Sequence, residues 1–330
     1  MPDGIKEVSA ATYAATADHF DDAALSFWDR FGRETVARIG LRPGDRVLDA
    51  CCGTGASALP AAHAVGATGR VVGLDLSEPA LALARAKADA AGLTNTEFRS
   101  ADVEHTGLPS ESFDAVVCVF GVFFLPDIAA AIAELWRLVR PGGTLAITIW
   151  GPDFLEPATT AFWAAVGTDR PDLVGAFHPW TRVTDPAALE RLLAQAGVAG
   201  VAGVAGVAGV AGVAGVAGVA GVAGVAGEAG VAAQAVGAEP GVGADPAVGA
   251  EPGVEAKPTV EAESGTHPLA RPDDWWTIVL GTGYRATVEQ LDLAAARRVR
   301  TANVTWLRQH DIRELQANVI YARARRQATT

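Results

Sequence analysis

The sequence predicts an α/β fold in which a doubly wound, mostly parallel sheet is covered by helices on both faces. Five short apolar segments alternate with segments of helical periodicity over the first 150 residues, and this is the order of elements in such a sheet. Acidic residues follow several of the apolar segments directly. Open α/β sheets bind their ligands at the carboxyl ends of the strands, so the same pattern predicts a binding site at one edge of the sheet.

We expect five short, apolar strands. The first ends at 46–48, and the other four cover 69–75, 96–102, 113–120 and 144–150. The run 113–120 is long and rich in β-branched residues, which is typical of a central parallel strand buried on both faces. Helices are expected between the strands. One covers 78–91 after a cap at Ser77, and another begins at Asp127.

The segment 47–55 combines a strand end, an acid and two glycines. Asp49 lies at the carboxyl edge of the first strand. Gly53 and Gly55 let the backbone turn tightly and approach a bound molecule, because neither carries a Cβ. A helix that starts at Ala56 has N-terminal N–H groups that can receive an anionic group. These features together predict a nucleotide-type site.

Two further acids follow the second and third strands. Asp75 lies 20 residues after Gly55, a position that suits a carboxylate accepting hydrogen bonds from both hydroxyls of a ribose. Asp75 as a simple helix cap is the alternative, but Ser77 is at least as good a cap, so the ribose role is favoured. Asp102 either accepts the exocyclic amine of an adenine, with Val103 packing nearby, or is an ordinary turn acid.

The segment before the first strand contains a helix around 23–39. Its large side chains, including Trp28, fall three and four residues apart and predict a face packed on the core. A lid over the ligand is the functional alternative. Tyr13 and Trp28 are the residues expected to take part in such a lid.

The order of these motifs along the chain is more specific than any one of them. The motifs are Asp49-x-Cys-x-Gly-x-Gly55, Asp75, Asp102, Phe113-Asp-Ala-Val-Val and Leu138-Val-Arg-Pro-Gly-Gly-Thr-Leu. Together they resemble the class I S-adenosylmethionine-dependent methyltransferases. Within that class, the chain is most similar to the small-molecule group that includes the ubiquinone- and menaquinone-biosynthesis C-methyltransferases. The resemblance covers about 13–195 and about 258–326.

The resemblance implies a Rossmann-like methyltransferase fold with seven strands and S-adenosyl-L-methionine as the cofactor. It places a sixth strand at 258–263 and a last, antiparallel strand at 318–322. The cofactor-binding residues that it implies are Asp49, Cys51, Gly53 and Gly55 at the methionine moiety, Asp75 with Leu76 at the ribose, Asp102 with Val103 at the adenine, and Phe120 beside the cofactor.

Cys51 departs from the family pattern, because it stands where the loop usually has its first glycine. Cysteine is small, so cofactor binding is compatible with it, but the backbone there must accept a Cβ. Cys51 and the adjacent Cys52 are interpreted as loop-packing residues rather than metal ligands, because no His/Cys set with zinc spacing accompanies them. No metal is expected.

An NAD-dependent oxidoreductase is the competing interpretation, since nicotinamide dinucleotides use the same strand, glycine loop and helix. Their fingerprint has a third glycine where this chain has Ala58, which some variants allow. Asp49 would repel a pyrophosphate but accept a methionine amino group, so methyl transfer is favoured. A non-catalytic cofactor-binding or assembly protein is the third interpretation.

Methyl transfer from a sulfonium depends largely on alignment of the nucleophile, so the catalytic residues stay unknown from the sequence. A general base is needed only if the acceptor loses a proton, and the candidates are His19, His178 and Tyr284, each of which also has an ordinary structural interpretation. No (Asp/Asn)-Pro-Pro-Tyr motif follows the fourth strand, which argues against adenine or glutamine amino groups as acceptors. A small, lipophilic acceptor is expected instead. Aromatic residues that would wall its pocket are Phe123, Phe124, Trp150, Phe154, Trp163, Phe177 and Trp180.

The composition narrows the partners and the compartment. A formal net charge of −12 gives no overall attraction for nucleic acid or anionic membranes. The three cysteines form no disulfide framework, which favours a reducing compartment. The first residues lack the basic and apolar regions of a signal peptide. We therefore expect a cytoplasmic protein.

Residues 196–225 are ten successive Ala-Gly-Val triplets, and a Gly/Ala/Pro/Glu-rich stretch follows to about Lys257. Glycine at every third place disfavours a helix, and a period of three does not give a strand with one apolar face. A membrane span is also disfavoured. We expect a flexible low-complexity insertion, 196–257, within a single domain made of 1–195 and 258–330. Self-association through the repeat, and hence a homo-oligomer, stays open.

Overall fold

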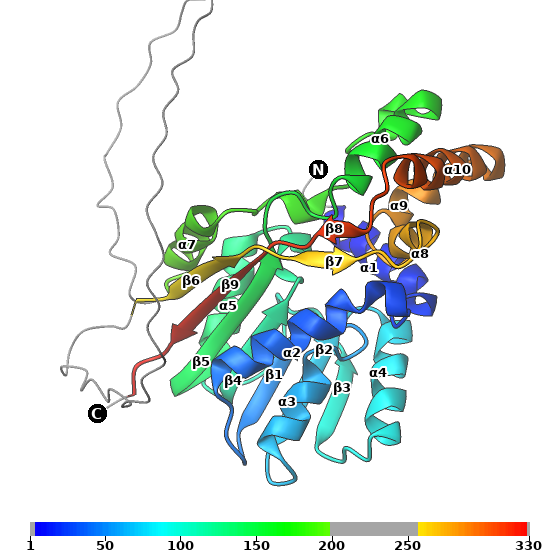
Figure 1. Cartoon of the computed structure of the whole chain (residues 1–330). Coiled ribbons are helices and arrows are strands. Elements are labelled where there is room, and N and C mark those ends of the chain that lie inside the picture. The colour runs from blue at the N-terminus through cyan, green and yellow to red at the C-terminus, as the bar shows by residue number, and fades with distance from the viewer. Residues whose placement is uncertain (1–3, 199–256, 329–330) are drawn as a thin grey trace, which may run out of the picture. The chain divides into compact units, whose positions relative to one another are not determined.

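A seven-stranded sheet forms the centre of the computed structural model, which describes residues 4–198 and 257–328 (Figure 1). The strands lie in the order β3-β2-β1-β4-β5-β9-β6. The first five strands pair in parallel, and β9 is antiparallel to both β5 and β6. Their bounds are β1 Arg46–Ala50, β2 Arg70–Asp75, β3 Thr96–Ser100, β4 Phe113–Val119, β5 Val139–Trp150, β6 Thr259–Glu263 and β9 Val319–Arg325. The predicted doubly wound, mostly parallel seven-stranded sheet is confirmed.

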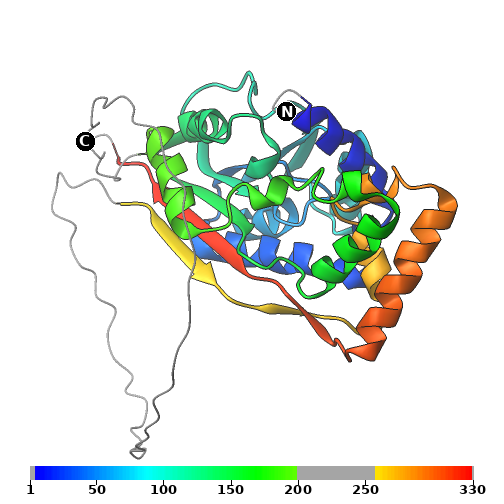
Figure 2. The ribbon, with the colours of Figure 1, turned by 90° about the horizontal axis from the view of Figure 1, so that it is seen from above.

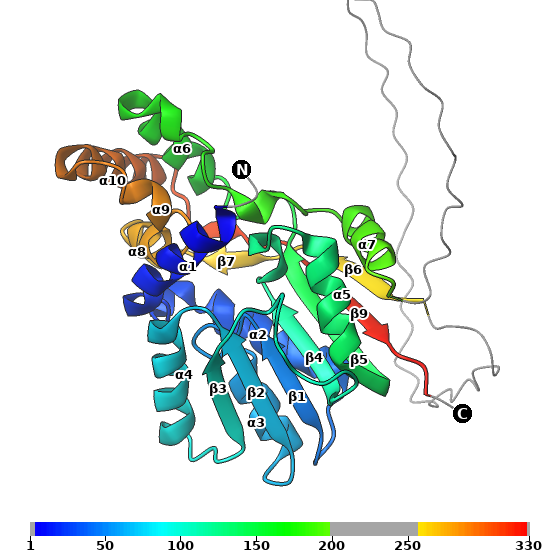
Figure 3. The same ribbon diagram turned by 180° about the vertical axis from the view of Figure 1, so that it is seen from behind.

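Helices cover both faces of this sheet. Figures 1 and 3 show α2 and α3 on one face and α5 and α7 on the other. The apolar residues of α3 and α4 share one buried cluster, which includes Val36 of α2. The bounds of the helices are α1 Ile5–Ala15, α2 Phe27–Ile39, α3 Ala58–Val65, α4 Glu78–Ala90, α5 Ile128–Leu138, α6 Ala158–Asp169, α7 Pro186–Gln195, α8 Asp274–Leu280, α9 Arg285–Val288 and α10 Leu293–Gln309.

A second group of helices lies beyond the carboxyl ends of the parallel strands. This group consists of α1, α6, α8, α9 and α10 (Figure 1), and Figure 2 shows α1 in dark blue and α10 in orange on the same side of the molecule. Asn303 of α10 joins three of these helices, since its side chain accepts a hydrogen bond from Trp275 Nε1 at 2.8 Å and donates one to the Ala161 carbonyl at 3.0 Å. The site expected at that edge of the sheet is therefore roofed by helices.

Both helix starts predicted from caps are confirmed. Ser77 Oγ accepts a hydrogen bond from the Ala80 amide at 3.3 Å, and the Asp127 carboxylate accepts one from the Ala130 amide at 2.9 Å. The satisfied amides are among those that a helix leaves without intrahelical partners at its first turn.

The structure differs from the predicted elements in several places, and the helix expected to start at Ala56 begins at Ala58. The helix expected around 23–39 begins at Phe27, because a short 3₁₀ turn, Ala23–Leu25, precedes it. The fifth strand begins at Val139 rather than 144, since Val139 already pairs with Phe113 before the register shifts. A small antiparallel pair, β7 Thr266–Pro268 with β8 Glu314–Gln316, had no signal in the sequence.

The repeat cannot be compared with its prediction, because 199–256 lie outside the described residues. Among the residues that are described, no helix is long and apolar enough to cross a membrane. The fold thus positions a candidate site through β1 to β4 and the helices above them.

Candidate functional site

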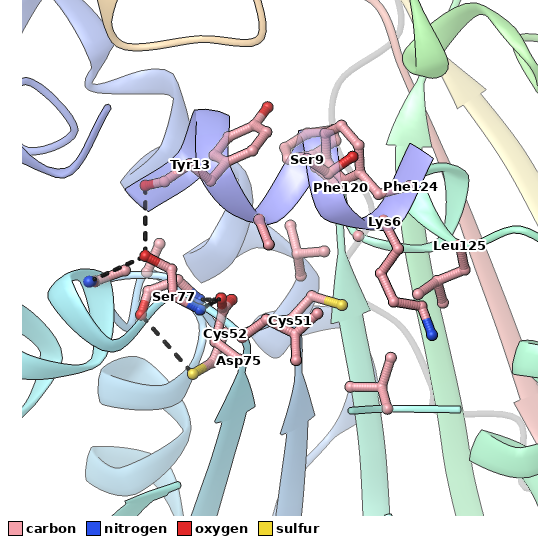
Figure 4. A pocket seen from close by; sticks show the side chains of 18 of the residues that line it. Lys6, Ser9, Tyr13, Cys51, Cys52, Asp75, Ser77, Phe120, Phe124 and Leu125 are labelled. Atoms are coloured by element: carbon pink, nitrogen blue, oxygen red, sulfur yellow. Dashed lines mark hydrogen bonds between the residues drawn. The ribbon is translucent and has the colours of Figure 1, made fainter. Parts of the chain in front are cut away.

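A pocket opens at the carboxyl ends of the parallel strands, with about 1000 Å³ free of atoms when its open mouth is included (Figure 4). Its walls come from the loops after β1, β2, β3 and β4, and its roof comes from α1. Seven of the nine predicted cofactor residues line it: Cys51, Gly53, Asp75, Leu76, Asp102, Val103 and Phe120. The sequence therefore located the pocket, and the two remaining residues lie just behind its wall.

Asp49 is one of the two residues behind the wall. Its side chain is fully buried, and its Oδ2 accepts a hydrogen bond from Ser57 Oγ at 2.7 Å. Its Oδ1 is buried without a hydrogen-bond partner among the described residues. Burial, together with the nearby Asp75 carboxylate, raises the pKa of Asp49 to about 7. This unpartnered carboxyl oxygen keeps its full capacity to accept a hydrogen bond.

Gly55 is the second residue that lies outside the lining. Its φ of +90° falls in a region that residues with a Cβ rarely adopt. A Cβ there would also lie 3.2 Å from Leu59 Cγ and 3.5 Å from Ala84 Cβ. Gly55 therefore shapes the loop and lets α3 and α4 pack behind it.

The carboxylate of Asp75 is held by two loops at once. Its Oδ2 accepts a hydrogen bond from the Gly53 amide at 2.9 Å, and its Oδ1 accepts one from the Ser77 amide at 2.8 Å (Figure 4). Burial raises the pKa of Asp75, and these amide hydrogen bonds only partly offset that effect. Ser77 is the residue that caps α4, so Asp75 is free of the capping role that was its alternative.

Asp102 follows β3, the strand next to β2, and is paired with a residue that the sequence analysis did not single out. Lys6 Nζ, from α1, donates to Asp102 Oδ2 at 2.7 Å, and the Glu104 amide donates to Oδ1 at 3.0 Å. Burial raises the pKa of Asp102, but the hydrogen bonds from Lys6 and the Glu104 amide, together with the positive charge of Lys6, lower it more, so the pKa lies below its usual value. No sequence signal marked Lys6, because 96 residues separate the pair.

The backbone at Cys51 explains how this loop accepts a side chain in place of the family's glycine. Cys51 has a φ of +59°, a conformation that costs a residue with a Cβ about 1–2 kcal/mol. The side chain fits because the neighbouring residue 121 is glycine: a Cβ there would lie 2.6 Å from Cys51 Cβ and 2.8 Å from Cys118 Sγ. A hydrogen bond with Cys118 and burial raise the pKa of the Cys51 thiol. Cys51 is therefore a protonated packing residue.

Helix α1 and the aromatic residues close the top of the pocket. Lys6, Ser9 and Tyr13 of α1 line the pocket (Figure 4), and the Tyr13 ring packs edge-on against Phe124 with a centroid distance of 4.9 Å. Trp28 belongs to the buried core and also lines the pocket. Both residues expected in a lid thus lie at the site.

The general-base candidates lie away from this lining. Tyr284 is fully buried and hydrogen-bonded to Thr159 at 3.0 Å. Burial lowers the pKa of His178 to about 4, its ring packs 4.3 Å from that of Trp163, and its Nε2 has no partner among the described residues. His19 lies 3.9 Å from the Asp18 carboxylate. None of the three is placed by the geometry to deprotonate a molecule in the pocket.

Of the aromatic residues expected around the acceptor, Phe124 lines the pocket. Trp150 is buried between Phe120 and Phe154, with ring centroids 3.8 and 4.0 Å away. Trp180 packs with His178 and Tyr284 in a separate aromatic group. In the part of the chain that the structure describes, no group of three or more His, Cys, Asp or Glu residues could hold a metal ion.

Comparison with known proteins agrees with this geometry. Residues 47–143 match a family model described as a methyltransferase domain. Nocamycin O-methyltransferase of Saccharothrix syringae is 33% identical over 168 residues, which are 48% of this chain and 59% of that protein. Aklanonic acid methyltransferase of Streptomyces sp. (strain C5) is 38% identical over 135 residues, covering 38% and 61%. Demethylmenaquinone methyltransferase of Listeria welshimeri is 36% identical over 117 residues, covering 36% and 50%.

The chain therefore spans about half to three-fifths of the length of the curated relatives that it matches. Among solved structures, a putative methyltransferase from Bacillus halodurans is 16% identical, with 90% of this chain and 99% of that chain covered and a TM-score of 0.48. The fold is assigned from the strand order and not from this similarity. Residues 47–143 thus match a methyltransferase domain, and the sheet that they help to form has the strand order β3-β2-β1-β4-β5-β9-β6 of a Rossmann-like methyltransferase fold.

Proposed function

We propose that this protein transfers the methyl group of S-adenosyl-L-methionine to a small, lipophilic acceptor. The observation that carries the proposal is the convergence of the glycine loop, Asp75 and Asp102 on one pocket. These groups come from three different strand ends, and each has the chemistry that one part of the cofactor requires. Bound there, the cofactor supplies an electrophilic methyl group on a sulfonium.

The residues present fit this cofactor. Asp75 has two carboxylate oxygens, each with one amide partner, so each retains a lone pair for a ribose hydroxyl. Asp102 and Val103 lie together for the adenine edge. The unpartnered Oδ1 of Asp49 suits the methionine ammonium, and forming that ion pair would keep the carboxylate charged despite its burial.

The chain's own contribution to the reaction is alignment and exclusion of water. Four aromatic residues, Phe20, Trp28, Phe120 and Phe124, line the pocket, and aromatic rings attract a cation such as a sulfonium. Helix α1 covers the pocket above them. Displacement at the methyl carbon then needs a nucleophile held in line, which lowers the entropic part of the barrier without a compulsory protein base.

The class of acceptor is inferred from the lining and from the relatives. The pocket wall is mainly apolar, and the three relatives are named for small-molecule acceptors. Both observations support a small, lipophilic acceptor for this chain.

Calorimetry with S-adenosylhomocysteine and with NAD tests the proposal. We expect one molecule of S-adenosylhomocysteine to bind per chain and NAD to show no heat of binding. Tight binding of NAD alone would overturn methyl transfer in favour of the oxidoreductase. Binding of S-adenosylhomocysteine without methylation of any acceptor in a broad panel would favour the non-catalytic alternative.

The organisation of the whole chain belongs to the same proposal. We infer a single domain from 1–195 and 258–330 with a flexible insertion, a cytoplasmic location, and no nucleic-acid partner, the last from the net charge of −12. Deleting residues 198–254 and measuring the oligomer size tests the insertion. An unchanged size is expected, and a smaller oligomer would assign self-association to the repeat.

A further inference from the structure

Lys6 connects the roof of the pocket to its adenine wall. The residue lies in the first turn of α1, and its Nζ is 2.7 Å from Asp102 Oδ2. Lys6 also forms an ion pair with Glu104. The side chains of Lys6, Asp102 and Glu104 are 21%, 31% and 15% exposed, so water screens this cluster less than it screens an open surface pair.

The same contact occupies the oxygen that an adenine amine would use. Asp102 Oδ2 is bonded to Lys6, and Oδ1 is bonded to the Glu104 amide. Both oxygens thus already accept one hydrogen bond before any ligand arrives. Each oxygen keeps a second lone pair, but a ligand amine that approaches Oδ2 must share the carboxylate with the ammonium group of Lys6, whose positive charge weakens that oxygen as an acceptor.

Lys6 also joins α1 to the loop after β3 through ion pairs. In the part of the chain that the structure describes, other contacts of α1 with the pocket wall are uncharged, such as the 3.5 Å hydrogen bond from Ser77 Oγ to the Tyr13 carbonyl and the packing of Tyr13 on Phe124. No other residue of α1 forms an ion pair there. Lys6 therefore supplies the ion-paired contact at the N-terminal end of the roof.

We propose that Lys6 is a gating residue, which holds α1 over the pocket through Asp102 and yields that carboxylate to the adenine amine when the cofactor binds. Glu104 remains as the partner of Lys6 in the bound state, so the ammonium group is never left unpaired. This inference rests on the proposed function, because it takes the ligand to be an adenine-containing cofactor. Burial lowers the pKa of Lys6, but its hydrogen bonds to Asp102 and Glu104 raise it overall, so the group stays charged.

Two substitutions distinguish the roles of Asp102 and Glu104 as partners of Lys6. They are expected to change the binding of S-adenosylhomocysteine in opposite directions. Lys6→Met removes the ammonium group that shares the Asp102 carboxylate. S-adenosylhomocysteine should then associate about twofold to fivefold faster, a factor that corresponds to the free energy of a partly exposed ion pair. Glu104→Gln leaves Lys6 with Asp102 alone, so the dissociation constant should rise by a similar factor. Lys257→Met, at an exposed lysine outside the pocket lining, is the matched control and should change neither quantity.

Amide hydrogen exchange without any ligand gives an independent measurement. Exchange in α1 should be faster in Lys6→Met than in the wild type and unchanged in Lys257→Met. If wild-type protein fails to bind S-adenosylhomocysteine, the proposed function fails, yet the exchange experiment still decides whether Lys6 holds α1. Weaker cofactor binding in Lys6→Met, or equal exchange in α1 with equal association rates, would overturn the gating role.

Discussion

The amide of Gly53 donates a hydrogen bond to Asp75 Oδ2 at 2.9 Å, so the glycine loop after β1 is joined directly to the acid after β2. The second oxygen of the same carboxylate is held by the Ser77 amide at 2.8 Å. The loop proposed for the methionine moiety and the acid proposed for the ribose therefore form one unit. A change at Asp75 should affect both ends of a bound cofactor.

We first predict that Asp75→Asn weakens binding of S-adenosylhomocysteine about 10-fold to 100-fold. The amide side chain has lost the charge and one acceptor, and hydrogen bonds to charged groups contribute about 1.5–3 kcal/mol. Calorimetry measures the change. Asp89→Asn, at an exposed position of α4, should bind like the wild type, and an Asp75→Asn protein with unchanged affinity would remove the ribose assignment.

A second prediction concerns the contact between Cys51 and Gly121. Gly121→Ala should lower the free energy of unfolding by about 1–3 kcal/mol, as in other overpacked interiors, because the new Cβ would lie 2.6 Å from Cys51 Cβ. Adding Cys51→Gly should restore much of the lost free energy of unfolding. The second change removes the Cβ of residue 51, and glycine adopts the φ of +59° without strain.

Denaturant unfolding of the wild type, both single variants and the double variant measures this coupling. The effects of the two changes should be non-additive, with the double variant more stable than Gly121→Ala alone. Additive effects would show that Cys51 and Gly121 do not accommodate each other.

These two contacts indicate what the sequence can and cannot predict. Strand-end acids such as Asp75 and Asp102 are predictable, because the carboxyl ends of parallel strands meet at one edge of the sheet. The fit of Cys51 against residue 121 depends on the pairing of β1 with β4, and no local pattern records that pairing. Sequence motifs therefore located the pocket but not the neighbours that make its loop possible.

The roof of the pocket was harder to predict than its walls. The residue type and place of Tyr13 predict a lid residue, but nothing in the sequence indicates Lys6, because its partner Asp102 is 96 residues away. Asp49 was predicted at the site and lies behind the lining. Whether a strand-end acid faces the cavity or the core depends on the path of the glycine loop, which short motifs do not specify.

A third prediction uses the pKa of Asp49, which is about 7 in the folded protein against 3.8 for an unperturbed carboxyl. The folded state binds this proton more strongly than the unfolded state does. Protonation of Asp49 therefore makes its full contribution to the free energy of unfolding below about pH 4. This contribution is lost as the pH rises towards 7, at no more than about 1.4 kcal/mol per pH unit.

Urea unfolding of wild type and Asp49→Asn between pH 4 and 7.5 tests this linkage. The wild-type free energy of unfolding minus that of the variant should fall as the pH rises. Groups with the opposite trend, such as His178, cancel in this difference because both proteins contain them. A difference that does not change with pH would contradict the raised pKa.

A fourth prediction concerns His178, whose burial lowers its pKa to about 4. The imidazole should stay neutral from pH 5 to 8, and its NMR signals should titrate with a midpoint near pH 4. A midpoint near 6.5, the unperturbed value, would show that the aromatic group around Trp163 does not bury it.

A crystal structure of the complex with S-adenosylhomocysteine tests the central claim most directly. We predict both ribose hydroxyls within about 2.5–3.0 Å of the Asp75 carboxylate oxygens, the adenine amine on Asp102, and the amino group of the homocysteine moiety towards Asp49. A ligand whose ribose lies away from Asp75, or whose adenine lies outside the wall formed by Asp102 and Val103, would contradict the proposed site.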